Sequence, residues 1–356
     1  MNIIKNFWLR LFLVPGFILL VGLSCNLPIQ PGFNLPGMSQ PTTPDILART
    51  SQSNYAYQIA ALSGAQPVTI GGETVVIATR YSYAMFTDQP NARAFEYILE
   101  QVRGWYPENQ IEIDDYPYTD AERTYTWKNL IVTIPGTTRP GEVVAFSAHL
   151  DSTVVREGNA LEAAPGANDN GTGAAALLEA ARIFSHVRFE RTVQLIWFSG
   201  EENGLAGSRA YVLDHTTDNI AALVNMDMFG TDTNGDRCFE IHAGSSPAAA
   251  AVGQAVTQAI QVYGLNLSYD FLTNLATDRS DHAAFWEKGV PAVTIIENFF
   301  DNGLPDGCAG VDGTPYYHRP SDTLDKVNLP YAVDIARAGI AAVSDLAVPA
   351  RQIKSW

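Results

Sequence analysis

Residues 143–151 read VVAFSAHLD, and residues 193–202 read VQLIWFSGEE. Both stretches begin as runs that are apolar nearly throughout, which is typical of strands covered on both faces of a parallel sheet. Both then end in acidic or imidazole side chains. Ligands of open α/β sheets bind beyond the carboxyl ends of the strands. We therefore expect the chemistry of this chain to lie where these two runs end.

Further strands and helices alternate around these two runs. Apolar or β-branched stretches also predict strands at residues 130–134, 222–226, 239–242 and 292–296. Apolar residues at helical spacing predict helices near residues 95–102, 174–181, 248–263 and 331–346. This alternation predicts an α/β fold, namely a three-layer α/β/α sandwich whose central, mostly parallel mixed sheet carries helices on both faces.

The composition is that of a globular protein with an acidic surface. The 356 residues are 46% hydrophobic and carry a formal net charge of −16. One domain of roughly 300 residues is expected once the N-terminal segments are set aside. An acidic surface disfavours nucleic acid and anionic membranes as partners. Solubility alone explains the charge, which therefore carries no information about the substrate.

The first 25 residues have the composition of an export signal. Lys5 and Arg10 precede an apolar run over residues 11–23, which is short for a membrane span. Ser24-Cys25 resembles a bacterial lipoprotein cleavage site. We therefore expect an exported protein, either a cell-surface lipoprotein anchored through Cys25 or a secreted protein, with an uncleaved anchor as a third alternative.

A tether and a single domain are expected to follow the signal. Residues 26–45 carry five prolines among small and polar residues, so they are predicted to form an extended tether. Residues 46–356 are predicted to form one domain. Cys238 and Cys308 could pair in an oxidising compartment, which would leave Cys25 for lipid. Two unpaired, buried cysteines fit the sequence nearly as well.

Polar residues at the ends of the apolar runs are the candidates for a site. His149 and Asp151 lie two residues apart, hence on the same side of a strand end, where Asp151 could orient a metal-bound imidazole. An ordinary hydrogen-bonded pair explains these two residues better when they are taken alone. Glu201 and Glu202 would repel each other at the end of a buried run unless a cation compensates. One acid could bind a metal while the other handles protons, although a solvated turn is the alternative.

A glycine-rich turn lies between the two runs. Residues 164–173 read APGANDNGTG and place Asp169 just before the start of a helix. Asn170 or Thr172 could cap that helix, which would explain part of the polarity of the turn. Asp169 itself is not explained by capping, so it joins the candidate ligands.

The candidates are more informative as a set than singly. Two histidines, two aspartates and one glutamate, with a second glutamate to spare, suit zinc, with cobalt or manganese as substitutes. Five ligands are one too many for a single tetrahedral zinc, and they fit two metals bridged by a carboxylate. The predicted metal ligands are His149, Asp169, Glu202, Asp227 and His318.

Six motifs in this order resemble the co-catalytic dizinc aminopeptidases of the aminopeptidase Y and bacterial leucyl aminopeptidase group. They are AHLDS, APGANDNGTG, FSGEENGLAGSRAY, NMDM, RSDHAAF and YYHRPSDTLD. The resemblance covers about residues 129–347 and, more loosely, the helix near residues 92–102. It implies a zinc peptidase domain and two Zn²⁺ ions.

The resemblance also implies a role for each matching residue. His149 and Asp227 would share one zinc, Glu202 and His318 would share the other, and Asp169 would bridge both. Glu201 would be the general base, and Asp151 would orient His149. A cis peptide bond would join Asp169 to Asn170. Asp281 and His282 match a motif without being ligands, so a local structural role is expected for them.

The chain also departs from the family pattern. Some members carry a cysteine pair just before the SDH motif, whereas residues 276–279 here are Ala-Thr-Asp-Arg. A longer segment, over about residues 298–317, separates Glu297 from His318. These differences leave the predicted metal ligands intact. They affect which side chain of the substrate the enzyme would prefer. Ile296 and Phe299 are expected to help form an apolar pocket.

The expected activity is removal of the N-terminal residue from a peptide substrate with a free N-terminus. In this metalloaminopeptidase, two zinc ions would activate a water and Glu201 would take its proton. A carboxypeptidase or dipeptidase is the closest alternative. A glutaminyl cyclase with one zinc and a non-enzymatic binding domain are the others. The sequence carries no signal for an oligomeric state.

Overall fold

The computed structural model describes residues 41–82, 90–121, 123–300 and 308–350, and all of them belong to one compact unit. The predicted export signal and residues 26–40 of the predicted tether lie outside the described residues. None of the described helices is both long and apolar enough to cross a membrane.

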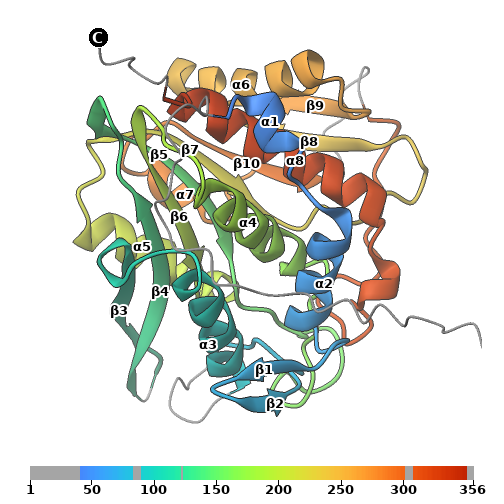
Figure 1. The fold of residues 1–356 in the computed structure, drawn as a ribbon. Coiled ribbons are helices and arrows are strands. Elements are labelled where there is room, and N and C mark those ends of the chain that lie inside the picture. The colour runs from blue at the N-terminus through green and yellow to red at the C-terminus, as the bar shows by residue number, and fades with distance from the viewer. Residues whose placement is uncertain (1–40, 83–89, 122, 301–307, 351–356) are drawn as a thin grey trace, which may run out of the picture. The chain divides into compact units, whose positions relative to one another are not determined.

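A mixed sheet forms the centre of this unit, and within the described residues it has eight strands in the order β3-β4-β6-β5-β7-β10-β8-β9 (Figure 1). The four central strands, β6, β5, β7 and β10, are parallel, whereas β3 and β4 are antiparallel at one edge. β8 is antiparallel to β10 and parallel to β9. A separate hairpin, β1–β2, precedes the sheet in the chain. The strands are β1 (Val68–Ile70), β2 (Glu73–Val75), β3 (Ile111–Thr119), β4 (Thr124–Ile134), β5 (Arg139–His149), β6 (Arg191–Phe198), β7 (Ile220–Met226), β8 (Cys238–His242), β9 (Ser268–Leu272) and β10 (Ala292–Glu297).

Helices cover both faces of the sheet, but unequally. The longer helices α4, α6 and α8, joined by α2 and α3, pack on one face, and the short helices α5 and α7 pack on the other (Figure 1). The predicted three-layer α/β/α sandwich is therefore confirmed. The helices are α1 (Thr43–Leu47), α2 (Gln52–Leu62), α3 (Pro90–Arg103), α4 (Gly171–Phe184), α5 (Ala206–Asp214), α6 (Pro247–Tyr263), α7 (His282–Trp286) and α8 (Leu329–Ala347), with 3-10 turns η1 (Glu108–Gln110), η2 (Glu201–Asn203) and η3 (Leu324–Lys326).

The run VVAFSA is apolar except for Ser147 because β5 is covered on both faces. Val144 and Phe146 belong to the large core under α4 and α8. Their neighbours Val143 and Ala145 point the other way, into the smaller core beneath α5 and α7. Successive side chains of a strand alternate between faces, so a strand between two helical layers is apolar at nearly every position.

The predicted strands and helices are all present, while the boundary of the predicted tether differs. α1 takes up residues 43–45, which we expected at the end of the tether. Thr42 and Asp45 form a capping box, and Pro44 suits the first turn of a helix because it needs no hydrogen-bonded N–H there. Thr43 is buried and donates a hydrogen bond to Asp345 of α8 at 2.6 Å. Residues 43–45 therefore belong to the folded domain and not to the predicted tether.

The order of the strands reverses beside β5. The chain passes from β5 through α4 to β6 on one side, and β7 then lies on the opposite side of β5. At such a point the helices leave the sheet in opposite directions and open a crevice beyond the carboxyl ends of the strands. The polar residues that end β5, β6 and β7 face this crevice.

Candidate metal centre

The predicted site residues lie at the carboxyl ends of the parallel strands. His149 is the last residue of β5, Asp227 directly follows β7, and the pair Glu201-Glu202 begins η2 just beyond β6. Asp169 lies two residues before α4, and His318 lies between β10 and η3. Segments far apart in the sequence thus deliver their polar side chains to one edge of the sheet.

Two groups of potential ligands share one residue. His149 Nε2 lies 3.1 Å from Asp227 Oδ1 and 3.4 Å from Asp169 Oδ1. His318 Nε2 lies 3.0 Å from Glu202 Oε2 and 3.2 Å from Asp169 Oδ2. Within each group of three residues, one potential ligand atom from each lies within 4.8 Å of the others. The two oxygens of Asp169 therefore face two different histidines, as a bridging carboxylate would.

The donors of this site fit metal ions. The side chains of His149, Asp169 and Glu202 are only 1%, 6% and 7% exposed. Glu202 Oε1 has no hydrogen-bond partner within the described part of the chain. Burying several carboxylates is costly unless positive charge compensates for the lost water. Imidazole nitrogens mixed with carboxylate oxygens are the donors that zinc takes in proteins.

The pKa values of the site reflect the same need for positive charge. Burial raises the pKa of Glu202 to about 7, and the charge of Asp169 adds to this effect. Burial alone would lower the pKa of His318, but the carboxylates of Asp169 and Glu202 raise it to about 10. The pKa of His149 is raised in the same way, by Asp227 and Glu201 against the effect of burial. The raised pKa values of both histidines therefore show that the surrounding carboxylates favour positive charge here, which is the charge that a metal would bring.

Asp151 acts on this site in a way that the sequence analysis missed. Its carboxylate accepts the backbone N–H of Glu201 at 3.2 Å and that of Glu202 at 3.1 Å. Toward His149 Nδ1, the nearer group is the backbone oxygen of Asp151 at 3.1 Å, while its carboxylate lies at 3.6 Å. Asp151 therefore orients His149 mainly through its carbonyl, and its carboxylate holds the two glutamates in place.

The turn that carries Asp169 is clamped from the far end of the chain. The carboxylate of Asp322 accepts the backbone N–H of Asn168 at 2.9 Å and that of Asp169 at 3.0 Å. Gly166 has a φ of +48°, and a Cβ at this position would collide with the carbonyl oxygen of Asp169. Only glycine fits such a close approach of backbone to backbone. The position of Asp169 is thus set by backbone contacts on both sides.

Asn170 connects the Asp169 turn to the strand that precedes Asp227. Its side-chain oxygen caps α4 by accepting the N–H of Gly173 at 2.9 Å, as one of the two predicted caps. Its amide donates to the carbonyl oxygen of Met226 at 2.9 Å. The Asp169-Asn170 peptide bond is cis, as the family resemblance implied.

Arg80 is a supporting residue that sequence reasoning missed. Its side chain is fully buried and donates hydrogen bonds of 2.6–2.8 Å to four backbone carbonyls, those of Leu62, Leu150, Pro165 and Gly166. Burial lowers its pKa to about 10, against nearby acids that raise it. Arg80 thus ties the end of β5 to the Asp169 turn. The sequence signal was slight, a lone arginine in the stretch IATRYSYA.

The residues of the SDH motif lie beside the ligands. His282 Nε2 lies 2.9 Å from the carbonyl oxygen of Thr277, which agrees with the expected structural role. Asp281 is fully buried, and burial raises its pKa to about 7. Neither residue belongs to the two groups of potential ligands.

A pocket of about 230 Å³ opens over the ligands. Ile296 and Phe299 line it, as the sequence analysis expected. Four further lining residues were not predicted, namely Met228, Arg279, Phe300 and Tyr317. Apart from the candidate ligands and Glu201, the walls of this small pocket are therefore aromatic or aliphatic, with one arginine.

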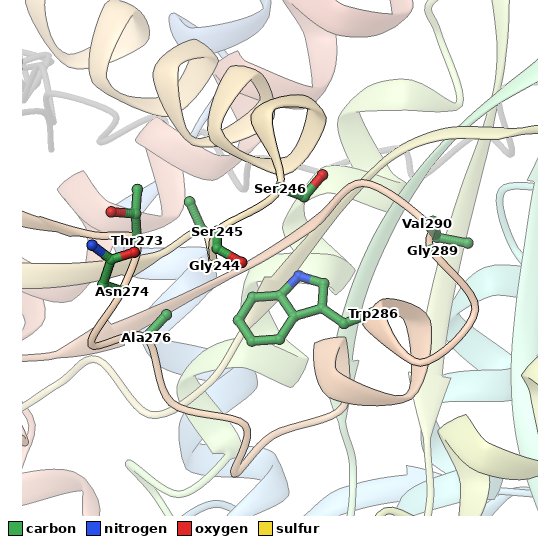
Figure 2. Close-up of a pocket in the computed structure, with 10 residues that line it drawn as sticks. Gly244, Ser245, Ser246, Thr273, Asn274, Ala276, Trp286, Gly289 and Val290 are labelled. Atoms are coloured by element: carbon green, nitrogen blue, oxygen red, sulfur yellow. The ribbon is translucent and has the colours of Figure 1, made fainter.

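A larger cavity, of about 530 Å³, lies elsewhere on the unit (Figure 2). The ring of Trp286 forms one wall, opposite the loop that holds Gly244 and Ser245 (Figure 2). None of the residues that line this cavity is titratable. They are Ala243, Gly244, Ser245, Ser246, Thr273, Asn274, Ala276, Trp286, Gly289 and Val290. The larger cavity therefore lacks groups for acid–base or metal chemistry, and the smaller pocket holds them.

The fold and the ligand groups define a metal-binding α/β enzyme with its site at a strand-order reversal. The chain belongs to Peptidase family M28, whose family model matches residues 129–343. The predicted family, fold and peptidase class are thereby confirmed.

Individual relatives are similar at moderate identity. A probable leucine aminopeptidase of Trichophyton verrucosum is 24% identical, over 75% of this chain and 70% of the relative. A probable zinc metalloprotease of Pyrenophora tritici-repentis is 27% identical, over 77% of this chain and 64% of the relative. The chain thus spans about two thirds of the length of these curated relatives.

Solved structures share the fold. The aminopeptidase from Aneurinibacillus sp. strain AM-1 has a TM-score of 0.63 at 18% identity, covering 88% of this chain and 98% of that one. A glutaminyl cyclase of Porphyromonas gingivalis has a TM-score of 0.62 at 15% identity, covering 83% and 98%. The fold is therefore common to peptidases and cyclases, and the activity must be argued from the site.

Proposed function

We propose that this protein is a zinc-dependent aminopeptidase that holds two metal ions. The observation that carries the proposal is the position of Asp169, whose two oxygens belong to two separate ligand groups. A single-metal site would not need the second group, formed by His149 and Asp227. The aminopeptidase and zinc metalloprotease names of the relatives support the same activity and metal.

The ligands divide between the two ions. His149 and Asp227 would hold one ion, Glu202 and His318 would hold the other, and Asp169 would contribute one oxygen to each. Zinc bound here supplies a Lewis acid that lowers the pKa of a water molecule and polarises a carbonyl. Asp151, Asp322 and Arg80 keep the ligands in place through the backbone contacts described above.

Glu201 is the proposed general base and acid. It lines the pocket beside the ligands but belongs to neither ligand group, so its carboxylate is available to protons. Burial raises its pKa well above the ordinary value, and Glu202 and Asp227 add to this against the opposing charge of His149. A carboxyl of raised pKa can take a proton from the attacking water and return it to the leaving amine.

The pocket supports removal of a single residue. Its volume of about 230 Å³ and its aromatic and aliphatic walls suit one apolar side chain. The surrounding carboxylates would attract the positive charge of a free α-amine. We therefore propose peptides with a free N-terminus and an apolar first residue as the substrate class.

One observation favours the alternative of a carboxypeptidase or dipeptidase. Arg279 lines the pocket, and its guanidinium lies 6.0 Å from the ring centre of Phe300. Arginine is well suited to a carboxylate, so Arg279 could bind the C-terminus of a substrate. A glutaminyl cyclase remains an alternative on the fold alone.

A panel of substrates tests these activities. We expect cleavage of leucyl and phenylalanyl p-nitroanilides, much slower cleavage of the aspartyl compound, and no cleavage of N-acetylated controls. Chelation should abolish activity and zinc should restore it, with two zinc ions per chain by elemental analysis. Release of the C-terminal residue from N-acetylated dipeptides would instead support the carboxypeptidase. One zinc per chain with cyclisation of N-terminal glutamine would support the cyclase.

We also propose that the protein is exported. A disulfide joins Cys238 to Cys308, and stable disulfides are typical of oxidising compartments. Pairing of these two cysteines leaves Cys25 for lipid. Mass spectrometry of the N-terminal peptide from the membrane fraction should find a lipid-modified Cys25. A chain that starts at Met1 and stays in the cytosol would contradict export.

A further inference from the structure

A second group of acidic side chains lies away from the metal centre. Asp232 and Asp236 belong to the loop TDTNGD that enters β8, and Asp312 lies in the segment after β10. One carboxylate oxygen from each lies within 4.8 Å of one from each of the others. We call these three residues the acidic cluster. None of them entered the sequence analysis as a ligand.

Asp312 is the buried member of the acidic cluster, and it is only partly satisfied. The residue is 4% exposed. Its Oδ1 accepts the backbone N–H groups of Thr233 at 2.7 Å and Asn234 at 3.3 Å, and the hydroxyl of Thr233 at 3.0 Å. Its Oδ2 has no hydrogen-bond partner among the described residues. A buried carboxylate oxygen left in this state is costly unless a ligand occupies it.

The acidic cluster also lacks a positive charge. Within the described residues, none of its three carboxylates lies within ion-pair distance of a lysine, arginine or histidine. Arg237 is adjacent in sequence, but its guanidinium donates to Asp334 at 2.7 Å and to the carbonyl oxygen of Asn266 at 2.7 Å. The donors that reach the cluster are neutral amides and hydroxyls. Three converging negative charges therefore remain without a counter-charge.

Covalent and hydrogen-bonded links hold the two halves of the cluster together. The Cys238–Cys308 disulfide joins the β8 loop to the segment that leads to Asp312. Asp236 accepts the backbone N–H of Cys238 at 2.9 Å and that of Ala309 at 3.0 Å. Asp312 N donates to the carbonyl oxygen of Asn298 at 3.0 Å. The carboxylates are therefore positioned in advance, as a binding site requires.

We propose that Asp232, Asp236 and Asp312 bind one calcium ion. Carboxylate oxygens are the donors that calcium takes, and waters can complete its flexible shell of six to eight oxygens. The absence of imidazole or free thiolate from the cluster disfavours zinc, since both cysteines nearby are in the disulfide. Magnesium demands a stricter octahedral geometry and keeps its waters, so it should bind more weakly.

The site would fix the segment that leads to the metal centre. Asp312 is followed by Thr314, whose hydroxyl donates to Glu297 at 2.5 Å, and then by His318. His318 has a φ of +56°, an unfavourable conformation for a non-glycine residue. A cation at Asp312 would therefore hold the segment that presents His318.

Calorimetric titration of the full-length protein tests the proposal without relying on activity. The protein is freed of metal and kept in a slight excess of Zn²⁺, so that the metal centre is filled, and Ca²⁺ or Mg²⁺ is then added. We expect one Ca²⁺ per chain, a rise in Tm with Ca²⁺, and at least tenfold weaker binding of Mg²⁺. Asp312→Asn should weaken Ca²⁺ binding at least about tenfold, because it removes one of three charges.

Two further variants make the outcome decisive. Asp236→Asn should weaken Ca²⁺ binding like Asp312→Asn, and it decides the matter if Asp312→Asn does not fold. Asp218→Asn removes a negative charge from an exposed site and should bind Ca²⁺ like the wild type. The proposal is wrong if the wild type binds no Ca²⁺ at millimolar concentration. It is also wrong if the folded Asp236 and Asp312 variants bind Ca²⁺ as tightly as the wild type.

Discussion

The candidate metal centre and the acidic cluster both bring carboxylates together, but the two regions differ in the other side chains they contain. In both regions carboxylates converge without enough positive charge from neighbouring side chains. The candidate metal centre also contains two histidines, and its potential ligands lie at the ends of β5 and β7 and in the turns beside them. The acidic cluster offers oxygen donors alone, on loops joined by a disulfide.

This difference bears on what each region can do. Ligands at the ends of buried strands are fixed by the core, so a catalytic site placed there keeps its geometry. Loops with oxygen donors tolerate the variable shell of calcium, which suits a role in stability. The proposed catalytic site and the proposed calcium site, which would stabilise the fold, therefore lie in different parts of the chain.

The largest expected effect is a loss of kcat without a loss of zinc, which distinguishes a proton-transfer residue from a metal ligand. Glu201→Ala should keep zinc but reduce kcat about a hundredfold to ten-thousandfold, because a general base is lost. Turnover of leucyl p-nitroanilide and elemental analysis give the two readings. Glu202→Ala is the matched control and should lose zinc instead. Normal turnover by Glu201→Ala would overturn the assignment of the base.

A smaller effect tests whether the two regions are independent. Asp322→Asn should weaken zinc binding roughly tenfold to a hundredfold, since one amide oxygen cannot accept both N–H groups as the carboxylate does. Chelator competition measures this affinity. Asp325→Asn, at an exposed acid three residues further on, should leave it unchanged. Calcium binding should be unaffected in both variants, and an equal loss at the acidic cluster would show that the regions are coupled.

The smallest effect concerns His282, a buried imidazole outside both regions. Burial lowers its pKa to about 3, whereas an unfolded histidine has a pKa of about 6.5. The unfolded chain therefore binds the extra proton between these values, and the free energy of unfolding falls as the pH falls through this window. The slope is at most about 1.4 kcal/mol per pH unit.

His282→Gln should remove this contribution, and urea unfolding between pH 4 and pH 8 measures it. The stability of the variant should fall less steeply than that of the wild type below about pH 6.5. Acid also releases metals, but it does so in both proteins, so their difference reports His282. Parallel curves for the two proteins would show that His282 does not titrate in this way.

The central strands could be predicted from the sequence because two cores make them apolar on both faces. The edge strand β3 was not predicted, since IEIDDYPYT is half exposed and rich in charge. The short helices α5 and α7 were not predicted either, because a helix of so few turns shows little hydrophobic periodicity in the sequence. A strand that is buried on both faces gives a continuous apolar run in the sequence, whereas an exposed edge strand gives no such run.

The residues of the two groups of potential ligands could also be recognised in the sequence, but the residues that support them could not. His149 and Asp227 follow recognisable runs, whereas Arg80 reaches the site from a stretch with no motif. Its role depends on backbone carbonyls, which have no sequence signature. The acidic cluster was missed because Asp312 is 76 residues from Asp236 in the chain, and the pairing of Cys238 with Cys308 was left open.

The clamp by Asp322 has a consequence for the timing of biosynthesis. A ribosome makes Arg80, His149 and Asp169 long before it reaches His318 and Asp322. Until that last segment emerges, the ligand group of Glu202 lacks the imidazole of His318, and the turn of Asp169 lacks its hydrogen-bond acceptor. A nascent chain would therefore be an incomplete peptidase, and the activity would appear only when nearly the whole domain has been made.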